Sequence, residues 1–217
     1  MYKAVIFDLD GTLTDTLDDL MHSVNHVLEK NHFPLRKKTE IRSFVGNGLR
    51  MLMSRSLPEG TSDQLIDRMT DELTMYYKDH SLVYTRPYEG ICQLLAVLRD
   101  HGIHCAVATN KNEQAAKNIC QLFFGDLIET VKGDNGKRPL KPSAECIDEI
   151  IALFAVEKSE ILYVGDSEPD AYTAHNAGLD SVGVLWGFRD KTVLENAGMH
   201  LFAENCQQLK NIILNCG

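Results

Sequence analysis

The sequence predicts an α/β protein with a doubly wound, mostly parallel sheet as its core and an all-helical domain inserted into that core. Two observations predict the core: short apolar runs rich in β-branched residues recur along the chain, and amphipathic helical patterns separate them. Strands that alternate with helices in this way indicate repeated βαβ units. A third observation predicts the insertion, because residues 16–82 contain helical patterns and no strand-like run.

The expected strands are apolar runs with little alternation between apolar and polar residues. Such runs are typical of strands buried on both faces, as in a parallel sheet of the Rossmann-like type. They lie at residues 2–7 (YKAVIF), 104–109 (HCAVAT), 161–166 (ILYVGD) and 181–186 (SVGVLW), with a weaker candidate at 128–133 (IETVKG).

Helical patterns fill the intervals between the later strands. The segment 89–102 carries apolar residues at positions 91, 94, 95 and 98 and ends at Gly102, a residue type that commonly stops a helix. Segments 112–123 and 143–154 have similar spacing. We therefore expect residues 1–15 and 83–217 to form the α/β core.

Residues 16–82 are expected to form the inserted helical domain. Helical patterns occur at residues 16–33, 46–57 and 62–80. A single crossover between parallel strands needs far fewer residues than this interval provides. Two short connections, at residues 14–16 and 81–87, would join the domain to the core, an arrangement that suits hinge closure.

Composition excludes some classes of function and leaves others open. The chain has 217 residues, of which 44% are hydrophobic, and its net charge of −9 argues against a general nucleic-acid binder. No apolar run approaches the length of a membrane span. The six cysteines form no C-x-x-C pair, which fits small buried hydrophobic residues in a reducing compartment. We expect a cytoplasmic protein without a membrane partner, either a monomer or a homodimer.

Polar residues follow the predicted strands at the point where each strand ends. Taken singly, each group has a structural explanation as a turn, a helix cap or a solvated loop lysine. Ligands bind at the carboxyl ends of the strands in open α/β sheets, however, so together the groups predict one site. The residues concerned are Asp8, Asp10, Thr109, Asn110, Lys111, Lys141, Asp166 and Asp170.

The order of these groups resembles the haloacid dehalogenase-like hydrolase superfamily. Its pattern is D-x-D-G-T, a strand-ending Ser or Thr, a Lys and then G-D-x-x-x-D, and all four elements occur here in order. The insertion resembles the helical cap of that superfamily. The segments FVGNGLRMLMSRSL (44–57), VATNK (107–111) and AGLDSVGVLWGFR (177–189) are similar to the phosphoglycolate phosphatase subgroup. The resemblance implies a phosphatase that acts on a small phosphorylated metabolite.

The resemblance also implies a role for each core residue. Asp8 would be the nucleophile, and Asp10 would protonate the leaving oxygen and then activate the attacking water. A carboxylate nucleophile divides a very slow hydrolysis into two steps through an aspartyl-phosphate. Lys141 would add fixed positive charge, and Thr109 would hold phosphoryl oxygens.

Magnesium is the expected cofactor, because Mg²⁺ prefers oxygen ligands. The ligands implied by the resemblance are Asp8, the main-chain carbonyl of Asp10 and Asp166, with Asp170 acting through a water molecule. A divalent cation would also offset the repulsion between these carboxylates and a phosphate dianion.

Substrate choice is expected to depend on the inserted domain. Arg50 is of a type that pairs bidentately with a substrate carboxylate, although a solvated helix arginine is an equally simple reading. We expect 2-phosphoglycolate; pyrophosphate, nucleoside monophosphates and sugar phosphates are the alternatives, with a mutase or a non-catalytic binding protein as rivals. The residues expected to bind substrate are Gly11, Thr12, Asn47, Arg50, Asn110 and Lys111.

Overall fold

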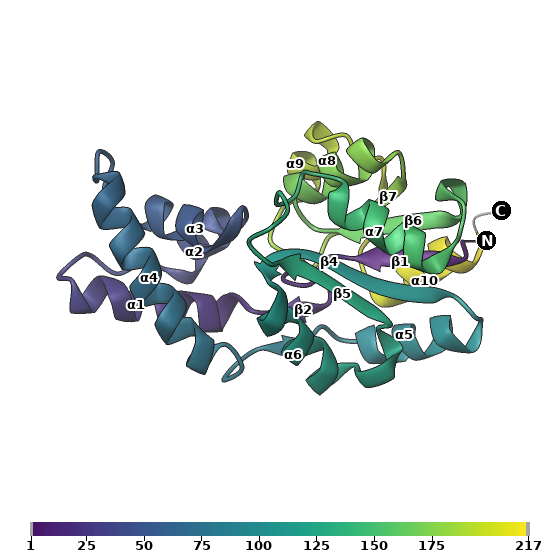
Figure 1. Cartoon of the computed structure of the whole chain (residues 1–217), viewed down its shortest axis with the longest axis horizontal. Helices are drawn as coiled ribbons and strands as arrows, with labels where there is room; N and C mark the ends of the chain where they lie inside the picture. The colour runs from purple at the N-terminus through teal and green to yellow at the C-terminus, as the bar shows by residue number, and fades with distance from the viewer. Residues whose placement is uncertain (1, 216–217) are drawn as a thin grey trace. The chain divides into compact units, whose positions relative to one another are not determined.

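The computed structural model describes residues 2–215, and the chain divides into two compact units (Figure 1). The core unit comprises Met1–Thr14 and Pro87–Gly217, and the helical unit comprises Asp15–Arg86. The sequence analysis expected the inserted domain at residues 16–82. Two short strands that pair with each other, β2 (Thr14–Asp15) and β3 (Arg86–Pro87), mark the points where the chain leaves the core unit and returns to it.

The core unit is built on a six-stranded parallel sheet, which confirms the predicted fold class. The strand order is β5-β4-β1-β6-β7-β8, and every neighbouring pair is parallel. The strands are β1 (Ala4–Phe7), β4 (His104–Asn112), β5 (Thr130–Asp134), β6 (Ile161–Gly165), β7 (Asp180–Val184) and β8 (Leu201–Ala203). The sequence analysis did not predict β8, because its three apolar residues, Leu201–Ala203, form too short a run to indicate a strand.

Both faces of the sheet are covered, and β1 shows why its sequence is apolar throughout. Val5 and Phe7 pack into one hydrophobic cluster with residues of α5 (Ile91–Asp100), α6 (Glu113–Phe123) and α10 (Cys206–Asn215). Ala4 and Ile6 pack into another cluster with residues of α7 (Glu145–Phe154) and α8 (Glu168–Ala177). Successive side chains of a strand point to opposite faces, so a strand covered on both sides has no polar position. In Figure 1 these helices flank the sheet on its two sides.

The helices of the core unit follow the predicted segments, with additions towards the C-terminus. Three of them agree with the sequence-based expectation: α5, α6 and α7. The shorter α9 and the terminal α10 did not emerge from the sequence. The bounds are α5 (Ile91–Asp100), α6 (Glu113–Phe123), α7 (Glu145–Phe154), α8 (Glu168–Ala177), α9 (Lys191–Asn196) and α10 (Cys206–Asn215), with single 3₁₀ turns at Gly125–Leu127 and Lys158–Glu160.

The helical unit contains four helices, one more than the sequence predicts. They are α1 (Leu17–Lys30), α2 (Lys38–Phe44), α3 (Gly48–Ser56) and α4 (Asp63–His80). The first helix buries Leu17, Leu20, Val24 and Val27, which recur at helical spacing. None of the helices among residues 2–215 combines the length and the apolar character that crossing a membrane requires.

A buried aspartate joins the two ends of the helical unit. The carboxylate of Asp19, on α1, accepts hydrogen bonds from the main-chain N–H groups of Tyr84 and Thr85 at 2.8–3.1 Å and from the Thr85 hydroxyl at 2.7 Å. Charged acceptors make strong hydrogen bonds when they are removed from water. Asp19 therefore ties the segment that enters the unit to the segment that leaves it.

Candidate active site

The strand order places the candidate site at the centre of the sheet. From β1 the chain first builds outward through β4 and β5, and it then returns to build the other half through β6, β7 and β8. The order therefore reverses at β1, and the crevice beside the carboxyl ends of β1, β4 and β6 is the usual ligand site of such folds. Most of the groups predicted from the sequence follow these three strands, and Lys141 lies on the loop between β5 and α7.

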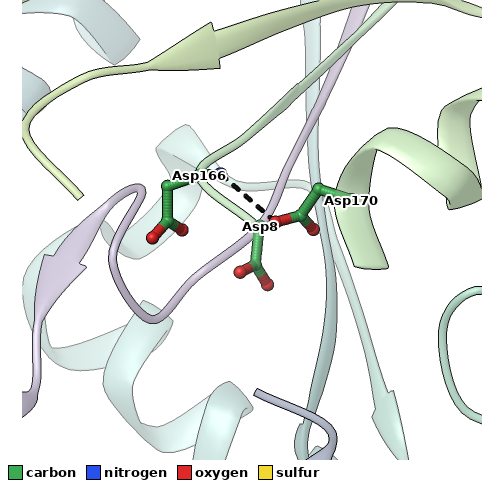
Figure 2. Close-up of side chains that lie close together, drawn as sticks. All are labelled: Asp8, Asp166 and Asp170. Atoms are coloured by element: carbon green, nitrogen blue, oxygen red, sulfur yellow. Dashed lines mark hydrogen bonds between the residues drawn. The ribbon is translucent and has the colours of Figure 1, made fainter. Parts of the chain in front are cut away.

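Three aspartates converge at this point (Figure 2). Asp8 directly follows β1, Asp166 follows β6, and Asp170 lies in the first turn of α8. One carboxylate oxygen from each lies within 4.8 Å of the others. Asp166 and Asp170 are fully buried and Asp8 nearly so. Buried carboxylates this close together need compensating charge.

Lys141 supplies part of that charge. Its ammonium lies 2.8 Å from Asp8 Oδ1 and 2.6 Å from Asp170 Oδ1, and the side chain is 4% exposed. Burial by itself would lower the pKa of Lys141, but the Asp170 and Asp8 carboxylates outweigh burial and raise it. Lys141 is therefore charged at any physiological pH and bridges the expected nucleophile and Asp170.

Asp166 is clamped by two loops that follow different strands. Its Oδ1 accepts a hydrogen bond from the Thr12 hydroxyl at 2.9 Å, and its Oδ2 accepts one from the main-chain N–H of Phe188 at 2.7 Å. Glycines line the carboxylate: a Cβ on Gly11 would lie 2.3 Å from Asp166 Oδ2, and one on Gly187 would lie 2.3 Å from Asp166 Cβ. The D-x-D-G-T loop thus needs its glycine to let this carboxylate approach.

The hydrogen bonds distinguish Asp170 from Asp166. Asp170 Oδ2 accepts from the main-chain N–H groups of Asp166 (3.2 Å) and Ser167 (3.0 Å) and from the Ser167 hydroxyl (2.5 Å), while Oδ1 accepts from Lys141 and from Tyr163. A carboxylate has about four lone-pair positions. Protein donors therefore occupy the lone pairs of Asp170. Each oxygen of Asp166 accepts one hydrogen bond, from Thr12 or Phe188, and keeps a lone pair that can bind a cation.

The electrostatics fit a divalent cation at this site. Burial, and then the charge of Asp170, raise the pKa of Asp8 to about 7, although Lys141 opposes them. Burial, followed by the charges of Asp170 and Asp8, also raises the pKa of Asp166 well above its usual range. One ammonium does not balance three buried carboxylates. An oxygen-preferring cation such as Mg²⁺ fits both the donor set and the missing charge.

Asp10 has a different environment from the three clustered aspartates. Both of its carboxylate oxygens lie 3.1 Å from the ammonium of Lys111, whose side chain is 5% exposed. Asp10 is also close enough to contribute to the raised pKa of Asp8. The sequence analysis expected Lys111 to bind substrate; in this structure its ammonium contacts Asp10.

The residues after β4 connect two of the predicted motifs. The Asn110 side chain accepts a hydrogen bond from the Lys141 main-chain N–H at 2.7 Å and donates one to the Lys141 carbonyl at 3.2 Å. The Thr109 hydroxyl accepts one from the Lys111 N–H at 3.2 Å. Asn110, expected to bind substrate, thus fixes the main chain that carries Lys141.

The two expected substrate residues of the helical unit lie at the start of α3. Asn47 precedes α3 with φ at 61°, in the left-handed region. The Arg50 guanidinium donates to Asp63 at 2.8 Å and to Asp67 at 2.7 Å, and all three side chains are exposed. Substrate contact by Asn47 and Arg50 stays a prediction.

Sequence reasoning missed two contributors to the site. Tyr163, in the middle of β6, places its hydroxyl against Lys141 and Asp170. The main-chain N–H of Phe188 reaches Asp166. A single tyrosine in the otherwise aliphatic run ILYVG is a visible signal for a buried hydroxyl that needs partners. No side-chain pattern reveals a main-chain donor such as Phe188.

Comparisons with known proteins identify the family of the chain. The model of the haloacid dehalogenase-like hydrolase family matches residues 5–184. The phosphoglycolate phosphatase of Neisseria meningitidis is 36% identical over 198 residues, covering 88% of this chain and 84% of that protein. The phosphoglycolate phosphatase of Haemophilus influenzae is 26% identical and covers 98% of both chains.

A solved structure extends the likeness to the whole fold. The crystal structure of a protein from Lactobacillus delbrueckii subsp. bulgaricus superimposes with a TM-score of 0.94 at 28% identity and covers 98% of both chains. Its naming as a phosphoglycolate phosphatase is itself provisional. The chain belongs to the haloacid dehalogenase-like hydrolase family and, within it, to the phosphoglycolate phosphatase-like group of phosphoric monoester hydrolases.

Proposed function

We propose that the protein is a Mg²⁺-dependent phosphatase that hydrolyses 2-phosphoglycolate through an aspartyl-phosphate on Asp8. The observation that carries the proposal is the cluster of Asp8, Asp166 and Asp170, whose carboxylate oxygens lie within 4.8 Å of one another beside the buried Lys141. Such a cluster offers a nucleophile, oxygen ligands and fixed positive charge at one point.

Asp8 is the nucleophile of the first step. One of its carboxylate oxygens attacks phosphorus, and the bond between phosphorus and the leaving oxygen breaks. Lys141, which contacts Asp8 at 2.8 Å, provides fixed positive charge for the phosphoryl oxygens. Asp8, the Asp10 carbonyl and Asp166 would hold Mg²⁺, which would supply charge neutralisation and orientation. The side chain of Asp170, with its five protein donors, orients Lys141 and would support the cation through a water molecule.

Asp10 moves the proton. It protonates the leaving oxygen in the first step and takes a proton from the attacking water in the second, which is typically worth about 10²–10⁴ in rate. Lys111 holds both Asp10 oxygens in the free protein. This contact fixes the orientation of the Asp10 carboxylate before substrate arrives.

The substrate assignment rests on the relatives and on Arg50. The curated relatives from Neisseria and Haemophilus are named phosphoglycolate phosphatases. The ion pairs of Arg50 with Asp63 and Asp67 are exposed, and exposed pairs are weak enough to be exchanged for a substrate carboxylate. Pyrophosphate, nucleoside monophosphates and sugar phosphates remain the competing substrates.

A panel assay tests the proposal. Phosphate release is measured with Mg²⁺ on 2-phosphoglycolate, pyrophosphate, a nucleoside monophosphate and a sugar phosphate, and kcat/KM is compared. We expect the largest value for 2-phosphoglycolate and no turnover after chelation with EDTA until Mg²⁺ is added back. Full activity in metal-free buffer would contradict the metal assignment. A larger kcat/KM for another compound would change the proposed substrate and leave the proposed phosphatase activity in place.

A further inference from the structure

Tyr163 is a fully buried tyrosine whose hydroxyl lies inside the charged network of the site. The ring packs with Ala4, Ile6 and Ile147 in the hydrophobic cluster on one face of the sheet. The hydroxyl accepts a hydrogen bond from Lys141 Nζ at 3.2 Å and lies 3.0 Å from Asp170 Oδ1, to which it donates. Hydrophobic packing thus explains the Tyr163 ring, but it does not explain why a hydroxyl group lies beside Lys141 and Asp170.

The groups around Lys141 Nζ indicate a role for the Tyr163 hydroxyl. An ammonium has three N–H donors, and four oxygens lie around Nζ: Asp170 Oδ1 at 2.6 Å, Asp8 Oδ1 at 2.8 Å, the Ala108 carbonyl at 3.1 Å and the Tyr163 hydroxyl at 3.2 Å. Two of these acceptors are charged, and two are neutral and attached to neighbouring strands of the sheet. The neutral pair fixes where the ammonium sits between the two carboxylates.

A fixed position for Nζ is needed because its charged neighbours change during the proposed reaction. When Asp8 becomes an acyl-phosphate it loses its charge, and a phosphate dianion brings new negative charge. An ammonium held only by carboxylates would follow these changes. Tyr163 and Ala108 lie on β6 and β4, which flank β1 in the sheet, so they keep their places whatever the charge on Asp8.

We propose that Tyr163 is a positioning residue of this active site: its hydroxyl, together with the Ala108 carbonyl, holds the Lys141 ammonium at the point from which it reaches both Asp8 and the phosphoryl group. This inference rests on the proposed function for its catalytic consequence. The geometric part, that the hydroxyl determines the position of Nζ, is independent of the reaction.

The test uses Tyr163→Phe, which removes one oxygen and keeps the ring. Tyr2→Phe is a matched control, because the Tyr2 hydroxyl also lies 3.0 Å from an aspartate oxygen, that of Asp180, away from the site. The side-chain ammonium signals of the full-length variants are compared by ¹H–¹⁵N NMR, with the Lys141 signal assigned by its loss in Lys141→Met. We expect that signal to shift or broaden in Tyr163→Phe and to stay unchanged in Tyr2→Phe.

Kinetics with Mg²⁺ and 2-phosphoglycolate complete the test. We expect kcat to fall about 3- to 10-fold in Tyr163→Phe, the size of one lost hydrogen bond, with KM changed less than about twofold. An unchanged Lys141 signal, or an unchanged kcat beside a lowered Tm, would show that the hydroxyl is only structural and would overturn the proposal. If the wild type releases no phosphate from any compound, the proposed function fails, and the NMR result still decides the position of Lys141.

Discussion

Lys141 in the core unit and Arg50 in the helical unit each contact two aspartates, yet the two arrangements differ in their surroundings. The Lys141 side chain is 4% exposed and its partners Asp8 and Asp170 are buried, whereas the Arg50 side chain is 47% exposed and its partners are more exposed still. Water screens the second set and not the first. The same pattern of charges is therefore tightly coupled to folding and chemistry in one unit and readily exchanged in the other.

The largest effect is expected from the carboxylate that this comparison places beside Lys141. Asp8→Asn replaces the proposed nucleophile by a neutral amide of the same shape, so kcat should fall by about 10³-fold or more. Asp180→Asn is the control, because Asp180 is an exposed aspartate of the same unit whose partner is Tyr2. Phosphate release at saturating Mg²⁺ measures both variants. Substantial turnover by Asp8→Asn would remove Asp8 from its assigned role.

A second prediction concerns stability and tests whether burial makes the ion pairs of Lys141 contribute more to folding than the exposed ion pairs of Arg50. Lys141→Met leaves Asp8 and Asp170 buried without their cation, a change that typically costs about 3–5 kcal/mol. Arg50→Met, in the helical unit, should leave the denaturant midpoint almost unchanged. Added Mg²⁺ should restore part of the stability lost in Lys141→Met, because a divalent cation can compensate the same carboxylates. Equal destabilisation by the two variants would refute the contrast drawn between the two units.

The sequence was informative where a residue type acts through its place at the end of a strand. Asp8, Thr109 and Asp166 could be grouped in advance, because the carboxyl ends of parallel strands lie along one edge of a sheet. Lys141 could be added to them from its place on a loop just ahead of a predicted helix. The grouping required no knowledge of distances. The fold class followed from the same alternation of strands and helices.

Other features depend on the tertiary structure and could not be read from the sequence. The two hydrogen bonds between Asn110 and the Lys141 main chain require the path of the loop that follows β5. The Tyr163 hydroxyl reaches Lys141 only because β6 lies beside β1. The short β8 has too few buried positions to produce a pattern. The first two features were missed because the sequence does not show which segments are neighbours, and β8 was missed because it is too short to give a signal.

A third prediction asks whether the exposed Arg50 is available to substrate. Arg50→Ala should reduce kcat/KM for 2-phosphoglycolate by roughly 10- to 150-fold, the value of one lost charge-assisted hydrogen bond, and should leave a neutral aryl phosphate nearly unaffected. Arg68→Ala is the control, because Arg68 is an exposed arginine of the same unit that pairs with Glu72. If both substrates lose the same factor, Arg50 is a surface residue whose partners are Asp63 and Asp67 alone.

The smallest effect is expected from a comparison of two carboxylates, one in each unit. Glu113 in the core unit contacts Lys117 at 2.7 Å and Arg138 at 2.6 Å and accepts from the Gly133 N–H. Although burial opposes them, these contacts lower the pKa of Glu113 to about 2. In the helical unit, hydrogen bonds from Lys30 and Asn31 also lower the pKa of Glu72, but the contacts of that carboxylate with Lys30 and Arg68 are longer, at 3.0 and 3.8 Å.

A carboxylate whose pKa is lower in the folded state stabilises the fold above its unfolded pKa, and the contribution disappears as the pH falls towards the folded pKa. Glu113 should therefore contribute fully above about pH 5 and lose its contribution between about pH 4.5 and 2. We expect Glu113→Gln to lower the free energy of unfolding by about 1–2 kcal/mol at pH 7, after screening by solvent, and by clearly less at pH 3.5. Urea unfolding at the two pH values measures the change. Glu72→Gln should give a smaller loss at pH 7, and hence a smaller dependence on pH, because the ion pairs of Glu72 are longer. A dependence as large as that of Glu113→Gln would mean that the short ion pairs of Glu113 do not give it a larger contribution to stability than Glu72 has.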